Sequence, residues 1–457
     1  MIHEYIWMGI YAVIYLVIFL IAGIIRKKFP EKEELSRKTS HFFGGIAALF
    51  IPLVIHSVLH VAILSAGFLV FLFVMRRLGH MKSIFEVGRK SIGVFLFPIT
   101  IFIIYFLAKD IYPYYFVAIL VLTFSDSAAA LIGTKYGSVK FEIEDNTKSL
   151  EGSVMFAVIT FLCVQIPLLL MTSLAKEQVI VISLIIAVVV TLFESLSPGG
   201  SDNFFVPLGT YYITERMSHY ALNYNLETCY QLLISMAIVL AVFTFIKAVK
   251  WSGKIVIMLV NFTCLSLIPY TAHFLWTGWF VTLVMVELFL ALAIAMYTAK
   301  VENTFPNYQV KPALYIGLVP VILIFIAAGF QNYDQLFLPY IAAFVAQGTL
   351  LATFFFTQIQ KQKKKRSMFF EICCAFIASI LTSGLIATVP VFLFSTGNYF
   401  IILGMVSLAS FLATVIYILL ARLFHDKKIM SSAGRRQKLR VIPTVICVLA
   451  VYFIQFV

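Results

Sequence analysis

Long apolar runs recur along the whole chain, and they restrict its fold more than any other feature of the sequence. Runs of about 18 or more apolar residues can cross the hydrocarbon layer of a membrane as helices, and we count about 15 or 16 of them. Backbone groups in hydrocarbon must be satisfied within their own segment, so each run is expected to be helical. The alternating pattern of outer-membrane strands is absent from the sequence. The sequence therefore predicts an all-α, polytopic membrane helix bundle.

Composition and charge agree with this class of protein. Of the 457 residues, 62% are hydrophobic and 12% are charged, and the mean hydropathy is +1.00. The net charge of +13 does not indicate nucleic-acid binding, because the basic residues cluster in short loops that orient membrane helices. The six cysteines lie mostly in apolar segments without metal-site or disulfide spacing, so we interpret them as small buried residues. The first 28 residues have no basic start and no cleavage site, which predicts a spanning helix and not a signal peptide.

The basic loops predict which side of the membrane each loop occupies. Basic clusters lie at 26–38, 76–90, 135–148, 247–254, 361–366 and 422–440. The positive-inside rule makes these loops cytoplasmic and places both termini outside, provided that the segment 203–217 crosses the membrane. The same topology brings four polar stretches to the cytoplasmic face, namely 36–45, 86–98, 134–152 and 194–207. Residues on one face can build one site.

The polar residues divide the chain into two parts. Residues 1–225 contain nearly all of the unusual polar residues near membrane depth, and we predict that this part is a catalytic membrane domain. Residues 226–457 form additional transmembrane helices, and their charged loops have the character of membrane anchors. No role is predicted for this second part.

The stretch FSDSAAALIGTKYG, residues 124–137, places an acidic residue inside the membrane zone. Asp126 precedes Lys135 by nine residues, or about 13 Å of helix, so it lies below the cytoplasmic loop. Ionisable residues at this depth are costly and are functional candidates by default. Small residues around Asp126 leave a thin helix surface that a helix or a ligand can approach. A structural ion pair or a capped carboxylate is the alternative interpretation.

Two stretches place neighbouring cations before an apolar run. Arg37 and Lys38 belong to SRKTSHFFGG, and Arg89 and Lys90 belong to EVGRKSIGVFLFP. Arginine offers a planar fork and lysine a point charge, and both suit a polyphosphate. A positive-inside anchor would explain each stretch by itself. We interpret His41, in the first stretch, as an interfacial hydrogen-bonding residue in preference to a catalyst.

The stretch EDNTKSLEGS, residues 144–153, combines a helix start with a cation. Asn146, Thr147 or Ser149 could cap the next span, and Glu151 would then lie in the first turn, where the helix dipole favours a carboxylate. Lys148 could hold a phosphate, and Gly152 could make room for one at a helix N-terminus. Capping alone would explain Glu151, but it would not explain Lys148 and Gly152 beside it.

The stretch FESLSPGGSDNFFVP, residues 193–207, adds carboxylates and an amide at a turn. Asp202 and Asn203 enter a short apolar segment that contains Pro207, and such oxygen ligands suit Mg²⁺. Turn chemistry and capping are the alternative. Together the stretches supply cations for phosphates and carboxylates for a metal, as phosphoryl or nucleotidyl transfer requires. P-loop and protein-kinase motifs are absent from the sequence.

In this order, RKTSHFFGG, FSDSAAALIGTKYG, KSLEGS and ESLSPGGSDNFFVPL resemble the motifs of integral-membrane CTP-dependent lipid kinases. This family includes dolichol kinase, phytol kinase and the yeast-type diacylglycerol kinase, and it is related to the phosphatidate cytidylyltransferases. The resemblance covers residues 20–225. It implies CTP as the phosphoryl donor, a membrane lipid alcohol as the acceptor, and CDP and a lipid phosphate as products. The expected protein is multi-pass, in the cell membrane of a bacterium or the endoplasmic reticulum of a eukaryote.

The family motifs and the chemistry of the four stretches assign an expected role to each site residue. The expected catalytic residues are Asp126 and Glu151, the nucleotide-binding residues are Arg37, Lys38, Gly133, Lys148 and Gly152, the metal ligands are Asp126 and Asp202, and the supporting residues are Arg89, Lys90, Asn203 and Pro207. The expected cofactor is Mg²⁺, held between the CTP phosphates and the carboxylates. Whether Asp126 or Glu151 orients the acceptor hydroxyl stays open. The expected partners are CTP, the lipid alcohol and membrane lipids, with no nucleic acid and with an undetermined oligomeric state.

Two other functions compete with the lipid kinase. A phosphatidate cytidylyltransferase would release pyrophosphate, but the long terminal signature of those enzymes is not evident in the sequence. A membrane transporter would also place an acidic residue near membrane depth, but the polar groups gather at one edge and no inverted repeat is visible.

Overall fold

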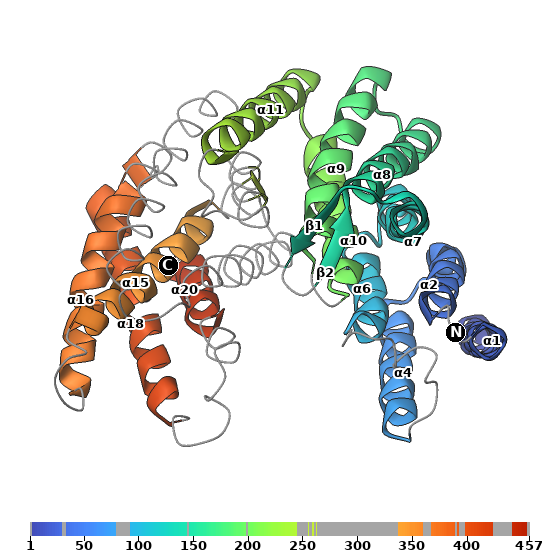
Figure 1. The fold of residues 1–457 in the computed structure, drawn as a ribbon, viewed down its shortest axis with the longest axis horizontal. Helices are drawn as coiled ribbons and strands as arrows, with labels where there is room; N and C mark the ends of the chain where they lie inside the picture. Colours follow the sequence, from blue (N-terminus) through green and yellow to red (C-terminus); the bar gives the residue numbers. More distant parts are fainter. Residues whose placement is uncertain are drawn as a thin grey trace. The chain divides into compact units, whose positions relative to one another are not determined.

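The computed structural model describes residues 2–29, 33–78, 92–143, 146–197, 200–244, 255, 258–259, 262, 337–359, 367–388, 391–392, 398–423 and 441–454. The chain forms two compact units, Met1–Cys229 and Tyr230–Val457 (Figure 1). The sequence placed a functional border between residues 225 and 226, and the assignment of catalysis to the first part stays a prediction.

The predicted all-α membrane class is confirmed by the described helices. Seven helices in this part of the chain are long and apolar enough to cross a membrane: His3–Lys28, Val58–Arg77, Tyr112–Tyr136, Leu150–Met171, Lys176–Leu196, Met368–Ala387 and Tyr399–Leu420. Large apolar side chains on their outer surfaces are exposed, including Leu20, Val70 and Leu170, as expected of surfaces that face lipid. The predicted total of about 15 or 16 spans includes segments outside the described residues and stays a prediction.

The first unit is a bundle of helices with one small hairpin (Figure 1). Its helices are α1 (Ile2–Lys28), α2 (Glu33–Leu49), α3 (Ile51–Val54), α4 (Val58–Arg77), α6 (Gly93–Leu107), α7 (Tyr112–Tyr136), α8 (Leu150–Met171), α9 (Lys176–Leu196), α10 (Asp202–Ser218) and the start of α11 (Leu222–Thr244). Helices joined by short connections pack against each other, as α8 does with α9 and α9 with α10. Because α7 contacts α2, α8 and α10, it lies in the middle of the elements that carry the polar stretches.

Helix α10 contains the segment whose membrane crossing the sequence left uncertain. Its 17 residues span about 25 Å, close to the thickness of the hydrocarbon layer. Most of its side chains are buried, including the polar Thr210, Thr214 and Arg216, because α6, α7 and α9 surround it. An interior helix does not need the continuous apolar surface of a lipid-facing span, which explains its mixed sequence. Its crossing of the membrane stays a prediction.

A two-stranded antiparallel hairpin, which the sequence did not predict, joins α7 to α8. Strand β1 (Lys140–Ile143) pairs with β2 (Asn146–Ser149), and the register places Lys140 opposite Ser149 and Phe141 opposite Lys148. The last residue of β2, Ser149, is also the N-cap of α8, and its hydroxyl accepts a hydrogen bond from the Gly152 N–H at 3.2 Å. The hairpin therefore holds Lys148 at a defined place beside the start of α8.

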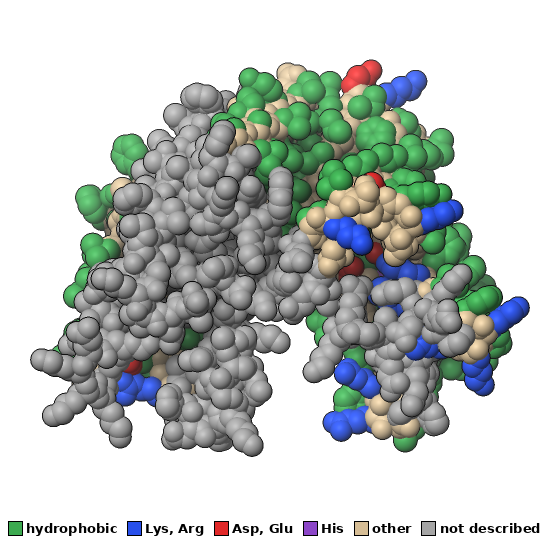
Figure 2. Space-filling model, in the orientation of Figure 1, with side chains coloured by type: hydrophobic (Ala, Val, Ile, Leu, Met, Phe, Trp, Pro, Cys, Tyr) green, Lys and Arg blue, Asp and Glu red, His purple; other side chains and the backbone are tan. Residues whose placement is uncertain are grey.

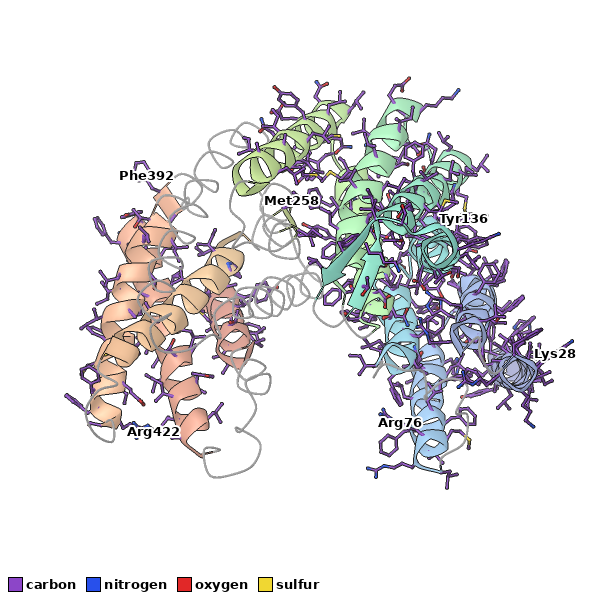
Figure 3. The ribbon with its side chains drawn as sticks, viewed as in Figure 1. Lys28, Arg76, Tyr136, Met258, Phe392 and Arg422 are labelled. Atoms are coloured by element: carbon purple, nitrogen blue, oxygen red, sulfur yellow. The ribbon has the colours of Figure 1, made fainter. Side chains whose placement is uncertain are left out.

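The second unit is described for α15 (Phe337–Ile359), α16 (Met368–Thr382), the π-helix η3 (Ser383–Ala387), α18 (Tyr399–Leu423) and α20 (Val441–Ile454). Buried hydroxyls connect these helices, since Thr349 Oγ1 lies 2.7 Å from Thr382 Oγ1 and 3.4 Å from Ser410 Oγ. Arg422, labelled in Figure 3, donates to Glu371 Oε2 from Nη2 at 2.9 Å. These contacts hold helices together, and they do not assign a chemical role to this unit.

Candidate active site

A close contact between α2 and α7 positions Asp126. A Cβ atom on Gly45 would lie only 2.9 Å from Cγ2 of the buried Thr123, so glycine allows the two helices to approach. Lys38 lies two turns before Gly45 on α2, and Asp126 lies about one turn after Thr123 on α7. This spacing brings both side chains to the same seam. Lys38 Nζ is 2.5 Å from Asp126 Oδ2, and Asp126 is 7% exposed.

His41 and Asn203 extend this centre toward α6 and α10. His41 lies one turn after Lys38, and its Nε2 is 2.9 Å from Asn203 Oδ1. The Asn203 amide nitrogen donates to the Gly93 carbonyl oxygen at 2.9 Å. A Cβ atom on Gly93 would lie 2.8 Å from the Gly200 carbonyl oxygen, so glycine is required for this close approach. His41 Nδ1 lies 3.8 Å from Asp126 Oδ2, which places the imidazole between the carboxylate and Asn203.

A second lysine–carboxylate pair joins the hairpin to α9. Lys148 Nζ is 2.5 Å from Glu194 Oε1 and also donates to the Glu194 carbonyl oxygen. Glu194 is 8% exposed in the last turn of α9. Asp126 and Asp202 both act on Glu194 electrostatically, so the two pairs belong to one cluster of charges. Figure 2 shows blue basic side chains beside red acidic side chains on the face of the first unit.

Arg37 and Asp202 lie at the edges of this cluster. Arg37 acts electrostatically on Asp126 and lines the same cavity as His41 and Asn203. Asp202 lies in the first turn of α10, where its Oδ1 accepts a hydrogen bond from the Asn203 N–H at 3.0 Å. The predicted residues Arg37, Lys38, Asp126, Asp202 and Asn203 are thus gathered from three separate helices.

Glu151 lies in the first turn of α8 and accepts hydrogen bonds from the residues just before the hairpin. Its Oε1 accepts hydrogen bonds from the Ser138 N–H at 2.9 Å, from the Val139 N–H at 3.1 Å and from the Ser138 hydroxyl. Three donors on one oxygen fix the path of the chain into β1, which pairs with the strand that carries Lys148. This arrangement favours a positioning role for Glu151 over a catalytic one.

Replacement of Glu151 by glutamine should separate these two roles. A glutamine oxygen can accept the same three hydrogen bonds, so we expect activity to stay within about fivefold of the unaltered protein. A catalytic carboxylate would instead lose about 10²-fold or more on this change. Glu151→Leu, which cannot accept hydrogen bonds, should lower activity and increase proteolysis in the 138–149 loop. Initial rates and limited proteolysis of purified variants measure both effects, and a glutamine variant as inactive as the leucine variant would contradict a positioning role.

Packing accounts for three residues that the sequence placed in the site. Gly133 and Gly152 face each other where α7 crosses α8, since a Cβ on Gly152 would lie 3.2 Å from Gly133 Cα and 3.1 Å from the Ala129 carbonyl oxygen. Pro207 is buried inside α10 and has no N–H to donate to the Asn203 carbonyl four residues earlier. Contact with a nucleotide stays a prediction for both glycines. Arg89 and Lys90 lie outside the described residues.

The structure also adds contacts that sequence reasoning did not predict. Glu194, one of the carboxylates in the stretch 193–207, lies in the last turn of α9 and pairs with Lys148, 46 residues away, and no local pattern reveals that pairing. His41 was interpreted as an interfacial hydrogen-bonding residue, and it does bond to Asn203, but it also faces Asp126. The Gly93 carbonyl enters the same network through its hydrogen bond from Asn203.

The chemistry of these groups fits a magnesium ion that a nucleotide helps to hold. The described residues contain no group of three or more His, Cys, Asp or Glu side chains arranged to bind a metal. Mg²⁺ is commonly held by one or two carboxylates together with substrate phosphates and water. Asp126 and Asp202 would supply those carboxylates, while the neighbouring lysines are suited to phosphate oxygens.

One comparison with known proteins bears on this site. The chain is similar to phytol kinase from Synechocystis sp., with 27% identity over 200 residues, covering 42% of this chain and 83% of that protein. No family model matches the chain, and no solved structure matches it. The comparison therefore relates less than half of this membrane protein to most of a kinase.

Proposed function

We propose that this protein is a kinase that transfers a phosphoryl group from CTP to the hydroxyl of a membrane lipid alcohol. The observation that carries the proposal is the cluster of two lysine–carboxylate pairs with buried carboxylates, Lys38–Asp126 and Lys148–Glu194, in a chain similar to phytol kinase. Such a cluster supplies both the cations and the carboxylates that phosphoryl transfer uses. The choice of CTP as donor rests on the motif resemblance. The lipid class follows from the similarity to phytol kinase and from the membrane fold.

The lysines would change partners when the nucleotide binds. Lys38 and Lys148 each donate to a carboxylate in the structure, and phosphate oxygens offer them an alternative charged acceptor. Arg37 acts electrostatically on the same centre and would hold a further phosphate oxygen. Mg²⁺ held by Asp126, Asp202 and the phosphates would neutralise charge on the transferred group.

The transfer itself needs few groups on the protein. The acceptor hydroxyl oxygen bonds to the γ-phosphorus, the bond to the β–γ bridging oxygen breaks, CDP leaves and the hydroxyl proton is released. Lys38, Lys148 and Arg37 stabilise the charge that spreads over the phosphoryl oxygens in the transition state. Glu151 would act indirectly, by holding the loop beside the hairpin that carries Lys148.

The function is tested by following the α- and γ-phosphates of the nucleotide in assays of purified full-length protein in lipid vesicles. With Mg²⁺ and γ-labelled CTP, we expect label in a lipid alcohol from a panel of phytol, polyprenols, dolichol and diacylglycerol. γ-Labelled ATP should give much less product, and α-labelled CTP should give no labelled lipid. Label from α-labelled CTP with phosphatidate would identify a cytidylyltransferase instead. Absence of label from every nucleotide and lipid would overturn the proposed activity.

A further inference from the structure

A cavity of about 70 Å³ lies beside the charged cluster, among α1, α2, α4 and α6. Its walls are mainly apolar and aromatic, with Phe19, Leu64, Phe68 and Phe97 among them. Polar side chains from α2 and α10, including Arg37, His41 and Asn203, line it as well. Two of the helices that line it, α1 and α4, are candidate membrane spans. It has room for a few water-sized groups, which corresponds to a short segment of hydrocarbon.

The imidazole of His41 presents an unused hydrogen-bond acceptor beside this cavity. The Asn203 amide nitrogen faces the Gly93 carbonyl, which can only accept, so Asn203 Oδ1 faces His41. Nε2 of His41 must then donate to that oxygen, which leaves Nδ1 as the acceptor of the neutral ring. Nδ1 is buried and has no hydrogen-bond partner among the residues that the structure describes, and the side chain is 8% exposed. An unpartnered polar atom of this kind is costly unless a ligand group satisfies it.

We propose that the cavity binds the first carbons of the lipid alcohol and that His41 Nδ1 accepts a hydrogen bond from its hydroxyl group. This inference rests on the proposed function. The apolar walls match the hydrocarbon, the polar lining matches the hydroxyl, and Nδ1 is 3.8 Å from the Asp126 carboxylate. The hydroxyl would therefore lie beside the charged cluster. His41 orients the acceptor in this arrangement, which leaves the Asp126 carboxylate to the metal.

Two neighbouring residues on α4 provide a matched pair of variants for the cavity. Leu64 lines it, whereas Ile63 is 48% exposed on the outer surface of the same helix. We expect Leu64→Trp to raise the KM for the lipid alcohol about tenfold or more and to leave the KM for CTP unchanged. Ile63→Trp should change neither constant by more than about twofold. Equal effects of the two substitutions on the lipid KM would overturn the cavity as the binding site.

Replacement of His41 tests the polar side of the proposal. His41→Phe keeps a planar ring but removes the acceptor, so the KM for the alcohol should rise and kcat should fall, about tenfold or more in kcat/KM. The KM for CTP should stay within about twofold. His219→Phe is the matched control, because His219 lies on the exposed C-cap of α10. A change confined to the KM for CTP would assign His41 to the nucleotide and contradict the proposal.

Photolabelling of the unaltered protein gives a readout that needs no turnover. A phytol analogue with a diazirine on its first carbons should label residues of α4 and α6 that line the cavity, and excess phytol should compete. Labelling spread over lipid-facing residues such as Val70 would overturn the cavity as the binding site. Labelling of the cavity without any phosphoryl transfer would retain the binding site and reject the kinase. Transfer without cavity labelling would retain the kinase and reject the binding site.

Discussion

Asp126→Asn is expected to lower phosphoryl transfer by about 10²-fold or more while the protein stays folded. Asparagine has the same shape, and its amide oxygen can still accept a hydrogen bond from Lys38, which lies 2.5 Å from the carboxylate. The substitution removes only the negative charge that would bind magnesium together with the nucleotide phosphates. A buried carboxylate beside a lysine can also be purely structural, so the effect must appear in kcat and not only in stability.

The matched control for this substitution is Asp110→Asn. Asp110 lies in the turn before α7 and its side chain is 83% exposed, so the same chemical change there should leave the rate within about twofold. Initial rates with γ-labelled CTP, measured on protein that elutes normally from size-exclusion chromatography, give the comparison. If Asp126→Asn and Asp110→Asn were equally active, Asp126 would be a structural partner of Lys38 and the proposed metal site would be wrong.

Asp126 stands out in the sequence as a functional candidate, because a charge inside an apolar run is unusual, and its role stays a prediction. Its partner was not predictable in the same way. Lys38 precedes it by 88 residues, and their contact depends on the close approach of α2 and α7 at Gly45 and Thr123. The same glycine could have been read as space for a ligand. Only the packed helices show that another helix fills that space.

The β1–β2 hairpin could not be predicted from the local sequence of this chain. The segment 140–149 is polar and charged and contains few strand-forming residues, so its sequence indicates a loop. Its strands form because the ends of α7 and α8 bring them together, and because Glu151 and Ser149 hold the flanking backbone. Long apolar helices, by contrast, follow from the needs of the backbone in lipid and were predictable without tertiary contacts.

Helices in the interior of the bundle are harder to predict from sequence than apolar spans and easier than the hairpin. Helix α10 was the least certain span in the sequence because its apolar character is weak and its end is polar. In the structure its own backbone satisfies two of its buried hydroxyls, since Thr210 and Thr214 donate to α10 carbonyl oxygens one turn earlier. Hydropathy scores how well side chains suit a lipid environment. It therefore underestimates the helical character of a membrane segment whose side chains face other helices. This physical limit explains why the apolar spans were recognised more securely than the helix that begins with Asp202 and Asn203.

The second large effect is expected for the pair Lys148–Glu194, and it concerns stability. Lys148→Met leaves the buried Glu194 carboxylate without its partner, which should lower the free energy of unfolding by about 3–5 kcal/mol. The double variant Lys148→Met with Glu194→Leu removes both charges and should recover most of that loss. Unfolding by denaturant in mild detergent, followed by intrinsic fluorescence, measures these differences. The partly exposed pair Arg422–Glu371 is the control, and Glu371→Gln should cost no more than about 1 kcal/mol.

The double variant then separates the structural role of Lys148 from its proposed chemical role. If Lys148 only anchors the hairpin to α9, a stable double variant should transfer phosphate at close to the normal rate. If Lys148 also holds phosphate oxygens of CTP, the stable double variant should have a higher KM for CTP and a kcat reduced by about 10²-fold. We expect the second result, because Lys148 pairs with Glu194, and Asp126 and Asp202 also act electrostatically on Glu194. A stable and fully active double variant would restrict the phosphate-binding cations to Arg37 and Lys38.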